Sequence, residues 1–178
     1  MRCGRDTPDE AVKKSLNKLI KRTASICDYL RAADPIQQWQ LIRFECPCCA
    51  SSRFLSMRKD PYMTRCLRCK ANVLNLSLIP SIRSHMTQHA VSTAWEMSTY
   101  GATLSFLESN VPDVIKSEFF AGRKSGEYIR GVLNQNVTAT SFKSDSLDMI
   151  TSNQVFEHVE NDIAGFAECY RILRSGGG

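Results

Sequence analysis

The sequence predicts an α/β protein in which a helix and a small four-cysteine segment precede a sheet with covering helices. In the second half of the chain, short apolar runs of strand length alternate with stretches of helical periodicity. In the first half, four cysteines form two C-x2-C pairs. Residues 1–89 hold sixteen Lys and Arg against seven Asp and Glu, whereas residues 90–178 hold seven against eleven. This charge asymmetry suggests two units with different partners.

The chain of 178 residues is long enough for one domain or two small ones, and its hydrophobic content of 43% is typical of globular proteins. No apolar run reaches the length of about 18 residues that a membrane-spanning helix requires. The N-terminal residues lack the apolar segment of a secretion signal. We therefore expect a cytoplasmic protein with no membrane partner.

Residues 8–33 have the pattern of a helix, which we assign with its flanks to an N-terminal helical segment (1–44). Asp9 and Glu10 fall in the expected first turn, where negative charge interacts favourably with the helix dipole. Pro35 ends the pattern because a residue before proline disfavours helical backbone angles. One face is basic, with Lys13, Lys14, Lys18, Lys21 and Arg22. This face is either solvated or a contact for phosphate groups.

The four-cysteine segment (45–80) has the spacing of a zinc ribbon. Two C-x2-C turns separated by sixteen residues supply the four soft ligands of a tetrahedral zinc ion, namely Cys46, Cys49, Cys66 and Cys69. A redox pair is the alternative, and Cys48 competes with Cys49 as a ligand. Four thiolates leave no open coordination position, so we expect structural Zn. The residues between the turns, around 53–57, suit a hairpin strand.

An apolar connection is expected over residues 72–80, followed by a helix that carries His85 and His89. These histidines are four residues apart, as in some metal sites, but no acidic partner lies nearby, so we interpret them as surface residues. A domain boundary is expected between Pro80 and Val91. Strands are then expected at 93–98, 114–117, 129–135 and 147–150, with helices after the first and the last. The last helix presents an apolar stripe of Ile163, Phe166, Ala167, Tyr170 and Leu173.

The last stretch, LDMITSNQVFEHVENDIAGFAECYRILRSGGG (147–178), resembles the region around strand four of class I S-adenosylmethionine-dependent methyltransferases. The resemblance covers about residues 90–178, roughly half of such a domain. It implies a partial Rossmann-like methyltransferase sheet with strand order 3-2-1-4. We therefore expect a C-terminally truncated fragment, or a chain that self-associates by pairing the open edge of strand four with a second copy.

The resemblance also implies site residues. The acidic residue and the turn after strand one correspond to Glu96, Ser98 and Gly101, although Ser98 and Tyr100 stand where glycines are usual. An acid that binds the cofactor ribose ends strand two, and a residue that contacts adenine follows strand three. The turn after strand four lies beside the methionine end of the cofactor. The matching residues here are Glu118, Asn136, Asn153 and Gln154, with His158 as the candidate general base. Structural packing is the alternative role for His158.

These features predict S-adenosylmethionine-dependent methyl transfer to a small-molecule or saccharide-type acceptor, with S-adenosylmethionine and structural Zn as cofactors. One alternative is a catalytically inactive, methyltransferase-like binding module, because the glycine turn is altered. The other is a zinc-ribbon RNA methyltransferase, since some ribosomal-RNA guanine methyltransferases also carry an N-terminal four-cysteine ribbon.

Overall fold

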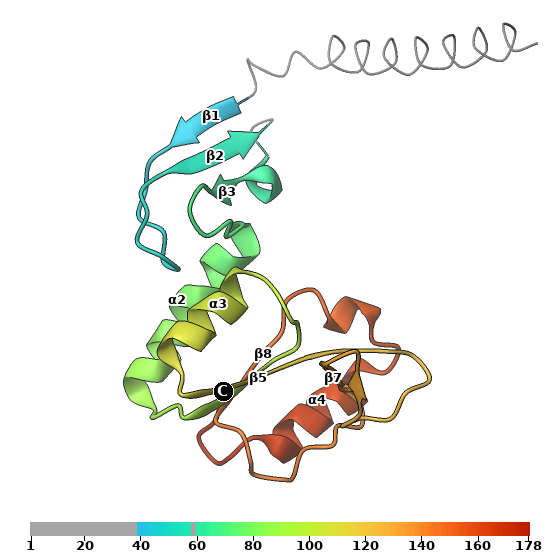
Figure 1. Cartoon of the computed structure of the whole chain (residues 1–178). Coiled ribbons are helices and arrows are strands. Elements are labelled where there is room, and N and C mark those ends of the chain that lie inside the picture. The colour runs from blue at the N-terminus through green and yellow to red at the C-terminus, as the bar shows by residue number, and fades with distance from the viewer. Residues whose placement is uncertain (1–38, 58–59) are drawn as a thin grey trace, which may run out of the picture. The chain divides into compact units, whose positions relative to one another are not determined.

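The computed structural model describes residues 39–57 and 60–178 (Figure 1). The helix expected over residues 8–33 lies outside these residues. The described part consists of a small three-stranded sheet, a linking helix and a five-stranded sheet with helices on its faces. This mixed α/β architecture with a mainly parallel large sheet agrees with the expected fold class.

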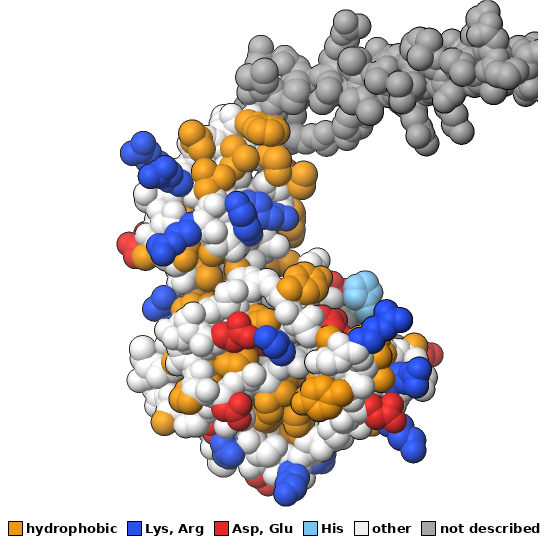
Figure 2. Space-filling model, viewed as in Figure 1, with side chains coloured by type: hydrophobic (Ala, Val, Ile, Leu, Met, Phe, Trp, Pro, Cys, Tyr) orange, Lys and Arg blue, Asp and Glu red, His pale blue; other side chains and the backbone are white. Residues whose placement is uncertain are grey.

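The small sheet has the order β1-β2-β3, with β1 at Trp39–Ile42, β2 at Phe54–Met57 and β3 at Arg65–Cys66. Strands β2 and β3 pair antiparallel, which confirms the expected hairpin strand. The connection between them contains a short 3-10 helix, η1 (Pro61–Met63). Figure 2 shows hydrophobic side chains interspersed with Lys and Arg over this part of the surface.

Residues 72–80, expected to form an apolar connection, instead begin helix α2 (Val73–Gln88). Asn72 caps the helix: its side chain accepts from the N–H of Asn75, and the Asn75 side chain accepts from the N–H of Asn72. This reciprocal pair satisfies N–H groups that lack a partner at the helix start. The prediction of a connection is therefore wrong, because the cap stabilises a helix that includes Pro80.

The large sheet has the order β6-β7-β5-β4-β8. Its strands are β4 (Thr93–Glu96), β5 (Asp113–Glu118), β6 (Tyr128–Ile129), β7 (Val132–Asn134) and β8 (Met149–Thr151). Strand β4 pairs parallel with both β5 and β8, and β5 pairs parallel with β7. Strand β6 is antiparallel to β7.

The single strand expected over 129–135 is a two-strand hairpin. Arg130 and Gly131 both have positive φ angles, 53° and 82°, as a tight turn between antiparallel strands requires. Strand β6 therefore lies at the outer edge of the sheet, beside β7.

Two hydrophobic clusters cover opposite faces of the sheet, because neighbouring residues of β4 point to opposite sides. Ala94 packs with Ile79 and Ile82 of α2 and with Phe106 and Leu107 of helix α3 (Ala102–Asn110). Trp95 belongs to the other cluster, with Leu147 and with Ile172 of helix α4 (Asp162–Ile172).

Helix α4 does not bury the expected apolar stripe. Ile163, Phe166 and Tyr170 are 74%, 57% and 85% exposed, whereas Gly165 and Ile172 are buried. A Cβ on Gly165 would lie 2.9 Å from a ring carbon of Phe156, so the missing side chain allows this close approach. Glu157 and His158 lie outside this helix, in a separate 3-10 turn, η2 (Phe156–His158).

The outer edge of β8 is not fully unpaired, contrary to the expectation. Gly178 N–H donates to the Asp148 carbonyl at 3.1 Å, and Ile150 N–H donates to the Gly178 carbonyl at 2.8 Å. Arg174 N–H likewise donates to the Leu147 carbonyl at 2.8 Å. The glycine run after α4 therefore pairs along this edge. Within the described residues, no helix has the length and apolar content needed to cross a membrane.

Candidate functional site

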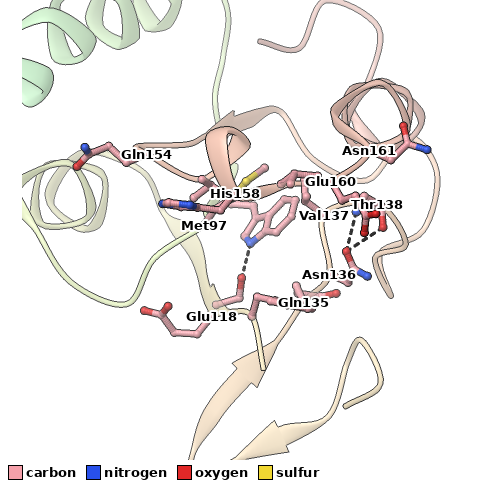
Figure 3. A pocket seen from close by; sticks show the side chains of 15 residues that line it. Met97, Glu118, Gln135, Asn136, Val137, Thr138, Gln154, His158, Glu160 and Asn161 are labelled. Atoms are coloured by element: carbon pink, nitrogen blue, oxygen red, sulfur yellow. Dashed lines mark hydrogen bonds between the residues drawn. The ribbon is translucent and has the colours of Figure 1, made fainter. Parts of the chain in front are cut away.

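A cavity of about 870 Å³ opens at the carboxyl ends of β4, β5 and β7 (Figure 3). Its wall is completed by the loop that follows β8. Open α/β sheets bind ligands at this end of their parallel strands, and the volume falls in the range of small-molecule sites. The lining residues in or directly after β4 and β5 are Trp95, Met97, Ser117, Glu118 and Phe119; those after β7 are 135–138, and those after β8 are 154, 155 and 158–161.

The cavity floor is the buried indole of Trp95. Its Nε1 donates a hydrogen bond to Ser117 Oγ at 2.9 Å, which fixes the ring between β4 and β5. Phe142 packs edge-on against the same ring, with centroids 5.0 Å apart. Met97 and Val137 add apolar surface, so the cavity combines an apolar floor with a polar rim.

Glu118, the predicted ribose ligand, lies in this cavity. Its Oε1 accepts hydrogen bonds from Thr99 N–H at 3.0 Å and from Thr99 Oγ1 at 2.6 Å. Within residues 39–57 and 60–178, Oε2 makes no hydrogen bond and remains available to a ligand. The turn after β4 thus orients the carboxylate. Sequence reasoning missed Thr99, and nothing in its local pattern distinguishes it.

Glu96, Ser98 and Gly101 do not line the cavity that the described residues form. Glu96 is 1% exposed, and its carboxylate accepts hydrogen bonds from the hydroxyls of Ser98 and Thr151. Burial raises the pKa of Glu96, and the two hydroxyls only partly offset that effect. Gly101, at φ 112°, precedes α3 in a conformation that favours glycine. These residues stabilise the turn rather than face the cavity.

Asn136, predicted to contact adenine, lines the cavity with part of its hydrogen-bonding capacity already used. Its Oδ1 accepts from Thr138 N–H at 3.0 Å and from Thr138 Oγ1 at 2.9 Å. This local turn is typical of asparagine. The neighbouring Gln135 is tied to Ser141 through both ends of its amide. The loop after β7 is therefore held in place by its own side chains, and the Asn-x-Thr pattern was the signal for that.

The predicted site residues in the loop after β8 do not all line the cavity. Gln154, at φ 55°, and His158 both line the cavity. Asn153 does not, because its Nδ2 donates to Thr103 Oγ1 at 3.0 Å, towards the start of α3. The structure therefore brings Glu118, Asn136, Gln154 and His158 to one cavity and places Asn153 beside it.

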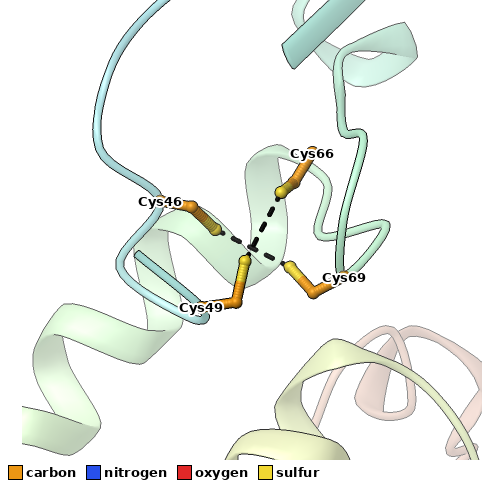
Figure 4. Close-up of side chains that lie close together, drawn as sticks. All are labelled: Cys46, Cys49, Cys66 and Cys69. Carbon is orange, nitrogen blue, oxygen red and sulfur yellow. Dashed lines mark hydrogen bonds between the residues drawn. The ribbon is translucent and has the colours of Figure 1, made fainter. Parts of the chain in front are cut away.

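The four predicted metal ligands converge on one point (Figure 4). All four sulfur atoms of Cys46, Cys49, Cys66 and Cys69 lie within 4.8 Å of one another. Two Sγ–Sγ distances are 3.7 Å (Cys46 to Cys69) and 3.6 Å (Cys49 to Cys66). A tetrahedral zinc ion with Zn–S bonds of about 2.3 Å has S–S edges of about 3.8 Å, so the arrangement fits zinc.

Cys48 is not part of this cluster. Its Sγ donates instead to the carbonyl oxygen of Ala102, the first residue of α3, at 3.4 Å. Among the clustered thiols, burial raises the pKa of Cys46 and Cys69. Burial also acts on Cys66, but the N–H groups of Cys69 and Arg68 lower its pKa to about 7. A bound cation would favour the thiolate form of all four.

Residues 85–178 match the model of a family described as a methyltransferase domain. The chain belongs to this family. It is thus a class I S-adenosylmethionine-dependent methyltransferase by family, and the matched region contains every strand and loop of the cavity. No curated protein matches the chain. The four cysteines precede the matched region, so the comparison does not bear on the metal site.

Proposed function

We propose that this methyltransferase binds S-adenosylmethionine in the 870 Å³ cavity and transfers its methyl group to a small-molecule or saccharide-type acceptor. The observation that carries this proposal is the position of Glu118. Its carboxylate lies at the carboxyl end of β5, is oriented by Thr99 and has one oxygen available. A carboxylate accepts hydrogen bonds from both hydroxyls of a ribose, which a neutral side chain does less well.

The remaining residues fit a cofactor that lies across the strand ends. Asn136 and its turn would contact the adenine, with Val137 providing apolar surface. Gln154, and Asn153 from the adjacent position, would lie at the methionine end. Glu96, Ser98 and Gly101 would act by stabilising the turn that holds Thr99.

Catalysis then consists mainly of alignment. When the cofactor is bound, its sulfonium supplies an activated methyl group, so the protein must hold the acceptor atom in line with it. His158 lines the same cavity and is the residue we propose to take a proton from the acceptor.

We further propose that the four cysteines hold a structural zinc ion and that residues 45–80 form a zinc ribbon. The support is the convergence of four thiols at tetrahedral spacing, in a segment whose buried residues Cys46, Phe54, Cys66 and Ala71 form a small cluster with Ala102 of α3. Metal binding supplies folding free energy to such segments.

A second candidate, methylation of RNA, is favoured by one observation. Phe44, Tyr62 and Leu67, which are close to the cysteines in sequence, have exposed side chains. Over this part of the surface, hydrophobic side chains occur among Lys and Arg residues (Figure 2). Such a combination suits base stacking next to phosphate contacts. RNA affinity that decreases steeply with added salt would support this candidate.

Isothermal titration with S-adenosylhomocysteine tests the proposed function. Binding by the native chain that is weakened at least about tenfold in Glu118→Gln would support it. The matched control is Glu108→Gln, because Glu108 is an exposed helix residue whose Oε1 pairs with Lys116. Absence of binding at millimolar concentration would instead favour a binding module that has lost its cofactor.

A further inference from the structure

A second cavity, of about 550 Å³, lies next to the first. Three segments that are distant in sequence contribute to it: η1, the first turns of α2 and the loop after β8. Gln154 lines both cavities, so they meet at this residue. The lining residues are Tyr62, Leu74, Ser77, Leu78, Ser152, Asn153, Gln154 and Glu157.

We propose that this second cavity binds the methyl acceptor, and that the acceptor is a neutral, hydroxyl-rich ring such as a saccharide. The proposal rests on the proposed function, because it needs the cofactor in the first cavity with its methionine end near Gln154. A ligand in the second cavity would then lie beside the methyl group to be transferred.

The lining determines the class of ligand. Among the lining residues that the structure describes, Glu157 is the one charged residue and none is Lys or Arg, so this lining disfavours phosphates, carboxylates and nucleic acid. Hydroxyl and amide groups come from Ser77, Ser152, Asn153 and Gln154. Leu74, Leu78 and the ring of Tyr62, which is 66% exposed, supply apolar surface. A ring with hydroxyls at its edge and apolar C–H faces satisfies both kinds of surface.

The polar side of the cavity is held in position by a buried hydroxyl. Thr103, 2% exposed, accepts hydrogen bonds at Oγ1 from Asn153 Nδ2 at 3.0 Å and from Asn75 Nδ2 at 2.9 Å. Within the described ranges, Asn153 Oδ1 makes no hydrogen bond, so it is free to accept one from a ligand hydroxyl. Asn75 also belongs to the cap of α2, which therefore helps to orient the acceptor site.

The transfer balances without another reactant. A hydroxyl oxygen of the acceptor forms a bond to the methyl carbon while the carbon–sulfur bond of the sulfonium breaks. The electron pair of that bond remains on sulfur, giving S-adenosylhomocysteine. The hydroxyl proton passes to His158, the base proposed above, which lines the first cavity and belongs to the same η2 turn as Glu157 of the second cavity.

The proposal can be tested by a substitution that fills the second cavity and leaves the first unchanged. Ser77→Trp places an indole in the lining from an exposed position of α2. Ser81→Trp is the matched control, because Ser81 is exposed, one turn further along the helix and outside the lining. Saturation-transfer NMR on the full chain, with saturating S-adenosylhomocysteine, would measure binding of methyl glucoside, maltose, N-acetylglucosamine and other neutral saccharides.

We expect at least one saccharide to bind the native chain and Ser81→Trp. In Ser77→Trp its affinity should decrease about tenfold or more, while the affinity for S-adenosylhomocysteine stays within about twofold. The proposal is overturned if no saccharide binds, if binding survives Ser77→Trp, or if an RNA oligonucleotide or a polyamine binds there instead. Failure of S-adenosylhomocysteine to bind the native chain is a separate result, which contradicts the proposed function itself.

Discussion

Thr99 donates two hydrogen bonds to the same carboxylate oxygen of Glu118, from its backbone N–H at 3.0 Å and from its hydroxyl at 2.6 Å. The bonds connect the turn after β4 to the end of β5. Glu118 lines the cavity, so the orientation of the proposed ribose ligand depends on a residue of the neighbouring turn.

Thr99→Val should weaken cofactor binding without unfolding the protein. The substitution removes the hydroxyl donor but keeps the backbone donor, and a hydrogen bond to a charged group contributes about 1.5–3 kcal/mol. We expect the dissociation constant of S-adenosylhomocysteine to rise about tenfold by calorimetry. Thr87→Val, on the exposed side of α2, is the control. Equal affinities for the two variants would contradict the assigned role of Thr99.

Variants of the cluster cysteines and of Cys48 should differ in the amount of zinc that they bind. Cys48→Ser should retain zinc, because the Cys48 sulfur faces Ala102 rather than the cluster. Cys46→Ser should bind much less zinc. Its ribbon should no longer unfold in a cooperative transition, since metal binding and folding are coupled in such segments. Elemental analysis and thermal unfolding would measure both effects. Loss of zinc from Cys48→Ser would mean that Cys48 is a ligand.

Glu168 should stabilise the fold in a pH-dependent manner. Its side chain is 13% exposed and accepts hydrogen bonds from Arg171 and from Thr140, and these contacts lower its pKa to about 2. A lowered carboxyl pKa stabilises the folded state above the unfolded value of 4.5, and the contribution is lost as pH falls towards about 2. Glu168→Gln should therefore lower the free energy of unfolding by about 1–3 kcal/mol at neutral pH.

Denaturant unfolding of Glu168→Gln and the native chain at several pH values checks this prediction. The difference between the two should shrink below the unfolded pKa. Glu160→Gln, at an exposed position, controls for the loss of one negative charge. A difference that does not change with pH would show that packing, rather than ionisation, accounts for the effect.

The contribution of Glu96 to folding stability should depend on pH in the opposite direction to that of Glu168. Burial raises its pKa, so its contribution to stability is fully present below the unfolded value of 4.5 and is lost as pH rises through the higher folded value. Glu96→Gln cannot ionise, so its free energy of unfolding should decrease less than that of the native chain as pH rises above 4.5. Parallel curves for the two proteins would exclude a raised pKa.

Gly165→Ala should disturb the η2 turn. The new Cβ would lie 2.9 Å from Phe156, and overpacking of this kind costs about 1–3 kcal/mol. Because His158 belongs to the same turn, we also expect weaker cofactor binding or slower turnover. Ala167→Ser, at an exposed position of α4, is the control. Unchanged stability in Gly165→Ala would show that Phe156 can move aside.

Sequence patterns predicted the residues at strand ends better than they predicted which face of a helix is buried. Glu118 is predicted at the end of a strand, and it is the last residue of β5 and lines the cavity, because parallel strands present their carboxyl ends at one edge of a sheet. Residues 72–80 are predicted to form an apolar connection, whereas the reciprocal cap of Asn72 and Asn75 begins a helix that continues through Pro80.

Tertiary packing explains the other differences. Helix α4 turns Gly165 towards Phe156, so the apolar periodicity of Ile163, Phe166 and Tyr170 does not identify its buried face. The contacts of Thr99 with Glu118 and of Thr103 with Asn153 join segments 19 and 50 residues apart. Local sequence patterns do not predict such contacts between distant segments.

The two tryptophans of the chain occupy contrasting surroundings, with Trp95 buried on the cavity floor and Trp39 54% exposed in β1. The emission of Trp95 depends on its hydrogen bond to Ser117 and on whatever lies above the ring. The protein therefore carries its own optical reporter of ligand occupancy. Quenching experiments with a water-soluble quencher can remove the Trp39 signal and follow the cavity without any attached dye.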